Sequence, residues 1–174
     1  MAIKVTLHRI DGAGPKQKEF ADEAVRLLAL AINHPTFASL VRAATFAAWH
    51  DDHEQEVSVA EVLNIIETGR ELKTGADYEL DLYVRLLRLR RRTVGWTDVG
   101  GPVITTAYWY INQCIRAQDP ADLAAHWMHE WLHVAGFYHH EGNRTRGDVP
   151  YVIGQLVYDL LGQIPETAPH HDAF

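Results

Sequence analysis

Three stretches of the chain carry hydrophobic patterns that predict β-strands. Residues 3–10 (IKVTLHRI) and 77–89 (DYELDLYVRLLRL) alternate between apolar and polar side chains, as half-buried strands do. In the second stretch the buried face is expected to consist of Tyr78, Leu80, Leu82, Val84 and Leu86. Residues 103–111 (VITTAYWYI) are rich in β-branched and aromatic residues and predict a third strand, preceded by a glycine-rich turn at 95–102.

Apolar residues at helical spacing predict most of the remaining chain to be helical. Helix-start and helix-stop residues fix two of the boundaries: Ser58 and Gly69 bracket one helix, and Asp119 with Pro120 begins another that stops at Gly136. Residues 34–46 predict a short helix or the approach to a strand. The predicted helices cover residues 18–32, 59–68, 120–135 and 148–162.

Length and composition indicate one domain. The chain has 174 residues, of which 47% are hydrophobic and 22% charged, ordinary values for a globular protein. Strands and helices are interspersed without repeats or an internal linker, which predicts a single α+β domain over residues 1–174. Residues 164–174 (IPETAPHHDAF) are expected to form a flexible tail.

The charge balance argues against polyanionic partners. The net charge of −7 does not favour binding to nucleic acid or to an anionic membrane, although five arginines cluster between Arg85 and Arg92. Cys114 is the only cysteine, which excludes an intrachain disulfide and a cysteine-based zinc site. Neither a signal peptide nor a membrane-spanning run is visible, so the expected location is the cytoplasm.

The sequence HEWLHVAGFYH, residues 129–139, contains three histidines at positions suited to binding one metal ion. His129 and His133 are four residues apart on a predicted helix and therefore project from one face. Gly136 tolerates the left-handed conformation that ends a helix, so the chain can turn back and bring His139 to the same point. Three imidazoles with one open position are typical of a catalytic zinc site.

Glu130 lies directly after the first histidine, within reach of a water molecule on the metal without being a ligand itself. A carboxylate in this H-E-x-x-H arrangement takes a proton from that water. His126, on the same helix face, is a rival ligand, but a packing or ligand-orienting role suits it better. His50 and His53, together with Asp51 and Asp52, allow a second cation site or an ordinary solvated loop.

At HEWLHVAGFYH the chain resembles the metzincin clan of zinc peptidases, whose extended motif it matches at every defining position. The resemblance implies a zincin-like fold: a small mixed or antiparallel sheet packed on helices, with the active-site helix carrying HExxH. It also implies that His129, His133 and His139 bind zinc and that Glu130 is the general base. Residues 136–148 look similar to the astacin branch of that clan. The family's antiparallel edge strand, which binds a peptide substrate, would correspond to residues 103–111.

One family feature is missing. Metzincins have a methionine turn beneath the zinc, but Met1 and Met128 both precede His139. Residues 148–154 (DVPYVIG) are the candidate replacement. Within them, Tyr151 is either a stabiliser of the oxyanion formed during hydrolysis or an ordinary aromatic residue of the last helix.

These features together predict a zinc-dependent metalloendopeptidase acting on a peptide or protein substrate. The alternative is a zinc endoribonuclease, because the endoribonucleases of bacterial ribosomal RNA maturation share the histidine spacing in the form H-G-x-x-H-x-x-G-x-D-H. Those enzymes have glycine where this chain has Glu130. A third possibility is a metal-binding interaction module without catalytic activity. Neither the substrate specificity nor the oligomeric state follows from the sequence.

Overall fold

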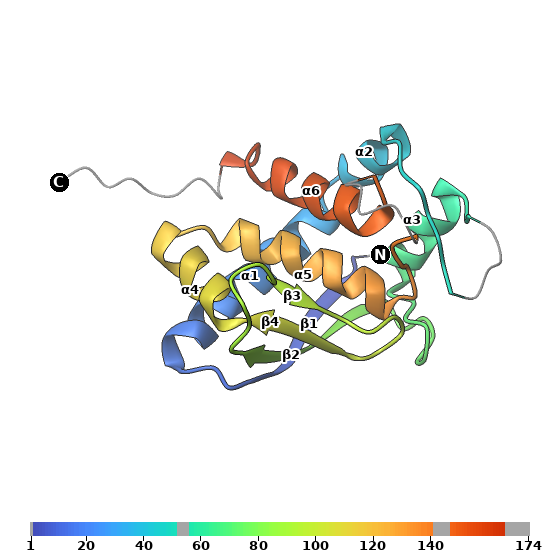
Figure 1. Ribbon diagram of the computed structural model, residues 1–174. Helices are drawn as coiled ribbons and strands as arrows, with labels where there is room; N and C mark the ends of the chain where they lie inside the picture. The colour runs from blue at the N-terminus through green and yellow to red at the C-terminus, as the bar shows by residue number, and fades with distance from the viewer. Residues whose placement is uncertain (1, 52–55, 141–146, 166–174) are drawn as a thin grey trace.

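The computed structural model describes residues 2–51, 56–140 and 147–165, which form a mixed α+β fold with a four-stranded sheet (Figure 1). The strand order is β1-β2-β4-β3. The strands β1 (Lys4–Asp11), β2 (Glu79–Leu87) and β4 (Val103–Ala107) are parallel. Only β3 (Gly95–Trp96) runs antiparallel to its neighbour, and it forms one edge of the sheet. The expected small mixed sheet is therefore confirmed.

Alternation of side chains along β2 is as the sequence predicted. Leu80, Leu82, Val84 and Leu86 are buried on one face of the strand. Tyr78 does not belong to this face, because it precedes the strand, has a positive φ of 65° and is 46% exposed. The buried face of β2 contributes to the core against which the helices pack.

Six helices are present in the described part of the chain. Ser58 caps α3 by accepting a hydrogen bond from the Glu61 backbone N–H, and Gly69 ends that helix in the left-handed conformation, both as predicted. Residues 34–46, for which the sequence allowed either a short helix or the approach to a strand, contain the helix α2. The helices are α1 (Pro15–Ile32), α2 (Phe37–Ala43), α3 (Val59–Thr68), α4 (Tyr108–Ala117), α5 (Pro120–Val134) and α6 (Val149–Leu161).

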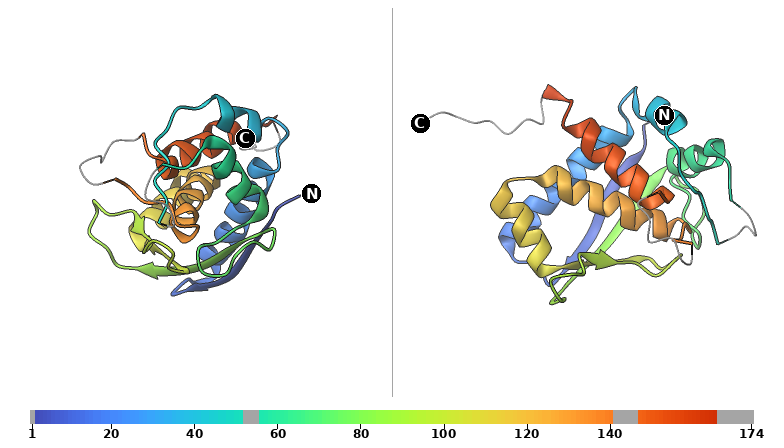
Figure 2. Two further views of the ribbon diagram at one scale, coloured as in Figure 1. Left: turned by 90° about the vertical axis from the view of Figure 1, so that its right-hand side faces the viewer. Right: turned by 45° about the horizontal axis from the view of Figure 1, so that its top comes forward.

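The helices are stacked in layers above the sheet (Figures 1 and 2). Helices α1 and α5 lie against the sheet and against each other, and α6 lies on the far side of α5. As a consequence α5 is enclosed, and ten of its fifteen residues are buried, among them Trp127 and Trp131. The helix that carries the histidines is thus the central element of the fold.

Two predictions about the sheet were wrong. The strand expected over residues 103–111 ends at Ala107, and Tyr108 begins α4, whose buried face consists of Tyr110, Ile111 and Cys114. This shorter strand, β4, pairs with neighbours on both sides and cannot be the edge strand. The edge position belongs to β3, within the stretch that the sequence predicted to be a turn.

The sequence predicted a flexible tail over residues 164–174. Ile164 packs partly against the core, so the predicted tail does not begin there, and residues 166–174 lie outside the described part.

Within the described ranges, no individual helix has both the length and the hydropathy to cross a membrane. Only the bent pair α1 and α2, joined at 70°, passes such a test.

Candidate metal centre and active site

Helix α5 is held rigidly at its start and along its buried face. The Asp119 carboxylate accepts a hydrogen bond from the Asp122 N–H at 3.1 Å, and Pro120 occupies the first turn, as the sequence predicted. The indole N–H of Trp127 donates to the Thr106 hydroxyl of β4 at 3.2 Å. The indole of Trp131 donates to the buried Glu71 at 3.1 Å. These contacts fix the rotation of α5 relative to the sheet.

The chain reverses direction after α5 at Gly136, which has a φ of +109°. A Cβ atom there would lie 2.8 Å from the Nε2 atom of His50, whose ring fills the space beside the glycine. The His50 ring also lies 2.9 Å from the Ala135 carbonyl oxygen and contacts Phe137 edge-on. Buried His50 therefore supports the turn and is not part of a surface cation site; His53 and Asp52 lie outside the described residues.

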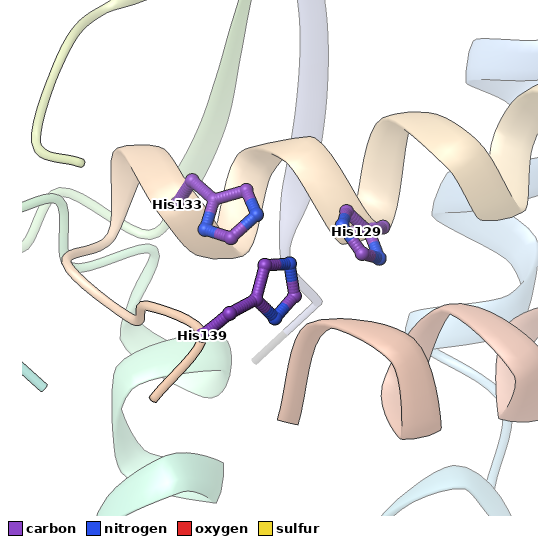
Figure 3. A group of neighbouring side chains, drawn as sticks. All are labelled: His129, His133 and His139. Carbon is purple, nitrogen blue, oxygen red and sulfur yellow. The ribbon is translucent and has the colours of Figure 1, made fainter. Parts of the chain in front are cut away.

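The turn brings His129, His133 and His139 together, as the sequence predicted (Figure 3). The ring centroids are 5.1 Å apart for His129 and His133, 4.8 Å for His133 and His139, and 5.3 Å for His129 and His139. One nitrogen from each ring lies within 4.8 Å of the other two. Small side-chain adjustments would bring all three nitrogens to the ~2.1 Å that a zinc–imidazole bond requires.

Each of the three rings has an oxygen acceptor near one of its nitrogens. The Nδ1 atom of His133 lies 2.8 Å from the Phe137 carbonyl oxygen, and that of His139 lies 3.3 Å from Oδ2 of Asp148. His129 is hydrogen-bonded to the Pro150 backbone, which offers only a carbonyl oxygen. Metal-binding histidines typically donate their second N–H in this way, which fixes the tautomer and leaves the other nitrogen for the ion.

Burial keeps two of the rings in the neutral form that binds metals. It lowers the pKa of His129 to about 2 and that of His133 to about 4. Asp148 is fully buried beside them, and its Oδ1 atom has no hydrogen-bond partner among the residues described. A buried carboxylate beside neutral imidazoles is stabilised by a nearby cation. The donor set and its charges therefore fit a divalent metal such as zinc.

The N-terminal turns of α6 pack against the histidines. Gly154 allows close packing of α6 on α5, because a Cβ there would lie 3.1 Å from the Ala125 carbonyl oxygen and 3.4 Å from the His129 Cβ. The Tyr151 ring lies 4.6 Å from that of His129 and stacks on that of His139 at 4.7 Å. Residues 148–154 thus occupy the position that the sequence assigned to them.

Glu130 is buried beside His126 and lines the same cleft as His129, and its carboxyl group lacks a full set of partners. Its Oε2 atom has no hydrogen-bond partner in the described ranges, and its Oε1 atom lies 3.7 Å from Nδ1 of His126. Burial raises the pKa of Glu130 to about 7, and the nearby Thr97 side chain acts in the opposite direction. A carboxyl group with a pKa near neutrality is suited to accept and return a proton.

The segment that starts with β3 runs beside α5 and borders a cleft. Gly95 lies next to His126, and farther along the segment the Gly100 N–H donates to the His133 carbonyl at 2.8 Å. The cleft has a volume of about 420 Å³ and reaches His129, Glu130 and Tyr151. Arg92, Asp122 and Gln155 lie along its polar side. Trp96, on the edge strand, is 41% exposed.

A second group of potential ligands, His8, Glu79 and Asp81, lies on the strands β1 and β2. His8 pairs with Asp81 and stacks on Tyr83, while Glu79 pairs with Lys4 at 2.9 Å. Because these side chains have partners on the surface of the sheet, the group is a weaker candidate for a metal site than the three histidines.

Comparison of the chain with protein-family models, curated proteins and solved structures gave no match. The site therefore has to be interpreted from its own geometry. Sequence reasoning included Asp148 only as part of the segment 148–154, without a role of its own, and it missed Thr97 and β3. Asp148 precedes Val149 and Pro150, an ordinary pattern for capping a helix, and β3 is too short to produce a periodic signal.

Proposed function

We propose that this protein is a zinc-dependent metallopeptidase. The observation that carries the proposal is the convergence of His129, His133 and His139. Glu130 lines the same cleft as His129, and its buried Oε2 atom has no partner among the described residues. The enclosure of these groups by α5 and α6 distinguishes them from a chance surface cluster. A zinc ion on the three rings would polarise a water molecule and the scissile carbonyl group.

In this proposal the chain's own residues move the proton and orient the reactants. Glu130 accepts the proton of the attacking water through Oε2 and delivers it to the leaving amine. The Tyr151 side chain, which contacts two of the three histidine rings, donates a hydrogen bond to the oxygen that gains negative charge. Asp148 and the carbonyl groups of Phe137 and Pro150 hold the rings in orientation.

The strand β3 is the proposed binding element for the substrate backbone. It is the edge of the sheet next to α5, so its outer side can pair with an extended peptide, as edge strands do in β-augmentation. This assignment replaces the strand at 103–111, whose position inside the sheet excludes that role. Exposed Trp96 is placed to contact a substrate side chain.

The test is a cleavage assay with the zinc-loaded protein and a mixture of denatured proteins. We expect cleavage that a chelator abolishes and that zinc restores. Glu130→Gln should retain zinc and lose ~100-fold or more in turnover, as expected for loss of a general base. Tyr151→Phe should also retain zinc and lose turnover, and Glu67→Gln on the exposed face of α3 is the matched control. Undiminished turnover in Glu130→Gln would contradict the mechanism.

An endoribonuclease remains the second candidate because of one observation. Arg92 lines the cleft next to the histidines, at the end of the arginine cluster that begins at Arg85. A parallel assay with structured RNA separates the two activities. Chelator-sensitive cleavage of RNA alone would favour the nuclease, and cleavage of neither substrate by the zinc-loaded protein would favour a binding module.

A further inference from the structure

His126 occupies a buried position on α5, one turn before the candidate general base. Its side chain is 8% exposed, and its ring contacts Tyr110 edge-on at 5.1 Å between centroids. The two ring nitrogens face different groups. Nε2 lies 3.3 Å from the Thr106 hydroxyl, and Nδ1 lies 3.7 Å from Oε1 of Glu130.

Trp127, which can only donate, favours one direction of the hydrogen bonds around this ring. Its indole N–H donates to the Thr106 hydroxyl, which leaves the hydroxyl proton free to be donated to Nε2 of His126. In this arrangement the proton of the neutral ring would lie on Nδ1 and face the Glu130 carboxylate. The opposite tautomer would point a lone pair at the carboxylate and leave the fully buried Thr106 hydroxyl proton without this acceptor.

The edge strand holds the ring in this place. A Cβ atom at Gly95 would lie 2.8 Å from both Cε1 and Nε2 of His126, and 2.3 Å from the Thr105 carbonyl oxygen. The absence of a side chain at this position of β3 therefore makes room for the imidazole between the strand and α5. His126 is packed from two sides and has little freedom to rotate.

We propose that His126 is a positioning residue for Glu130: its Nδ1–H, fixed by the Trp127–Thr106 chain, orients the Glu130 carboxylate toward the substrate. The inference rests on the proposed function, and it gives His126 a role other than that of a fourth metal ligand. The N–H faces Oε1 on one side of the carboxylate and leaves Oε2 to receive the proton. The distance of 3.7 Å corresponds to an electrostatic contact that need close only slightly to become a hydrogen bond.

The tautomer can be measured without any assay of activity. Multiple-bond ¹H–¹⁵N correlation spectra of the zinc-loaded protein distinguish protonated from unprotonated ring nitrogens, and the His126 signals are assigned by their loss in His126→Asn. We expect the proton on Nδ1 and a bare Nε2. A proton on Nε2, or rapid exchange between the two nitrogens, would overturn the proposal.

Kinetics of two matched variants test the positioning role. The amide of Asn places its NH₂ group near the position of Nδ1, whereas that of Gln reaches the position of Nε2. We therefore expect His126→Asn to keep turnover close to that of the wild type. His126→Gln should lower kcat by about 10- to 100-fold, with KM and zinc content unchanged.

Equal losses in the two variants, or loss of zinc in either one, would show that His126 does not act through Nδ1 on Glu130. Wild-type protein without peptidase activity would instead refute the proposed function, and the nuclear magnetic resonance measurement would still decide the tautomer. Glu130→Gln in the same assay separates the two failures, because it loses turnover whether or not His126 orients the carboxylate.

Discussion

Two buried carboxyl groups near the histidines have different surroundings and therefore different chemistry. Asp148 contacts Nδ1 of His139 at 3.3 Å through one oxygen and is fully buried, which suits it to orient a ligand ring. Glu130 also has one oxygen near a histidine Nδ1 atom, at the longer distance of 3.7 Å from His126, and burial raises its pKa to about 7. The closer contact to a ligand ring suits Asp148 to orienting that ring, and the raised pKa suits Glu130 to carrying a proton.

The role of Asp148 can be tested through zinc affinity. Asp148→Asn keeps the shape of the side chain but removes the charge, and the amide can turn an N–H toward His139 in place of an acceptor. We expect zinc to bind about 10- to 100-fold more weakly, as is usual when a ligand histidine loses its carboxylate partner. The measurement is competition with a chromophoric chelator, and Asp159→Asn, at an exposed position of α6, is the control. Equal affinities in both variants would show that Asp148 does not orient His139.

At the scale of helices and strands, predictions succeeded where a boundary depends on local chemistry. Ser58 and Asp119 cap their helices by hydrogen bonds within three residues, and Gly69 and Gly136 adopt the positive φ values that end them. The boundary between β4 and α4 was missed because Tyr108 and its aromatic neighbours suit a strand as well as a helix face. The two-residue strand β3 exists only through its pairing with β4, which no local pattern reveals.

The turn after α5 offers a test at this scale. Gly136→Ala should lower the free energy of unfolding by more than ~1 kcal/mol, because alanine is strained at a φ of +109° and its Cβ would clash with the His50 ring. Zinc should also bind more weakly, since the turn carries His139. Gly162→Ala is the matched control, because Gly162 has a φ of −63° and only ordinary contacts around an added Cβ. Similar urea midpoints for the two variants would contradict this account of the turn.

In the whole molecule, the site combines a part that is local in sequence with parts that meet only through folding. The metal-ligand set was predictable because helical spacing and one glycine suffice to bring His129, His133 and His139 together. The remaining parts depend on long-range packing: α6 places Asp148 and Tyr151 under the rings, and β3 places Thr97 and Gly95 beside α5. Their positions are set by how the layers stack, which a single sequence does not specify.

The enclosure of this site predicts how the metal-free protein responds to acid. Burial lowers the pKa values of His126, His129 and His133 from 6.5 to about 3, 2 and 4. As the pH falls below 6.5, these three histidines become protonated in the unfolded chain but stay neutral in the folded protein. Each ring therefore lowers the free energy of unfolding by ~1.4 kcal/mol per pH unit at most. Because the pKa of Glu130 is raised, this group increases the free energy of unfolding as the pH falls from about 7 to 4.5. Its contribution is smaller than the combined opposite contribution of the three rings.

We therefore expect the urea midpoint of the metal-free protein to fall steadily from pH 6.5 to 4.5. The fall should steepen below pH 4.5, where protonation of Glu130 no longer differs between the two states. It should become shallower near pH 4, where His133 is protonated, and continue at lower pH because His126 and His129 are still neutral in the folded state. The His126→Asn variant lacks one of the three rings, so its midpoint should fall less steeply over the same interval. A midpoint that stays constant or rises between pH 6.5 and 5 would mean that the rings are protonated in the folded protein as readily as in the unfolded chain. In that case α5 and α6 would not enclose the site in solution.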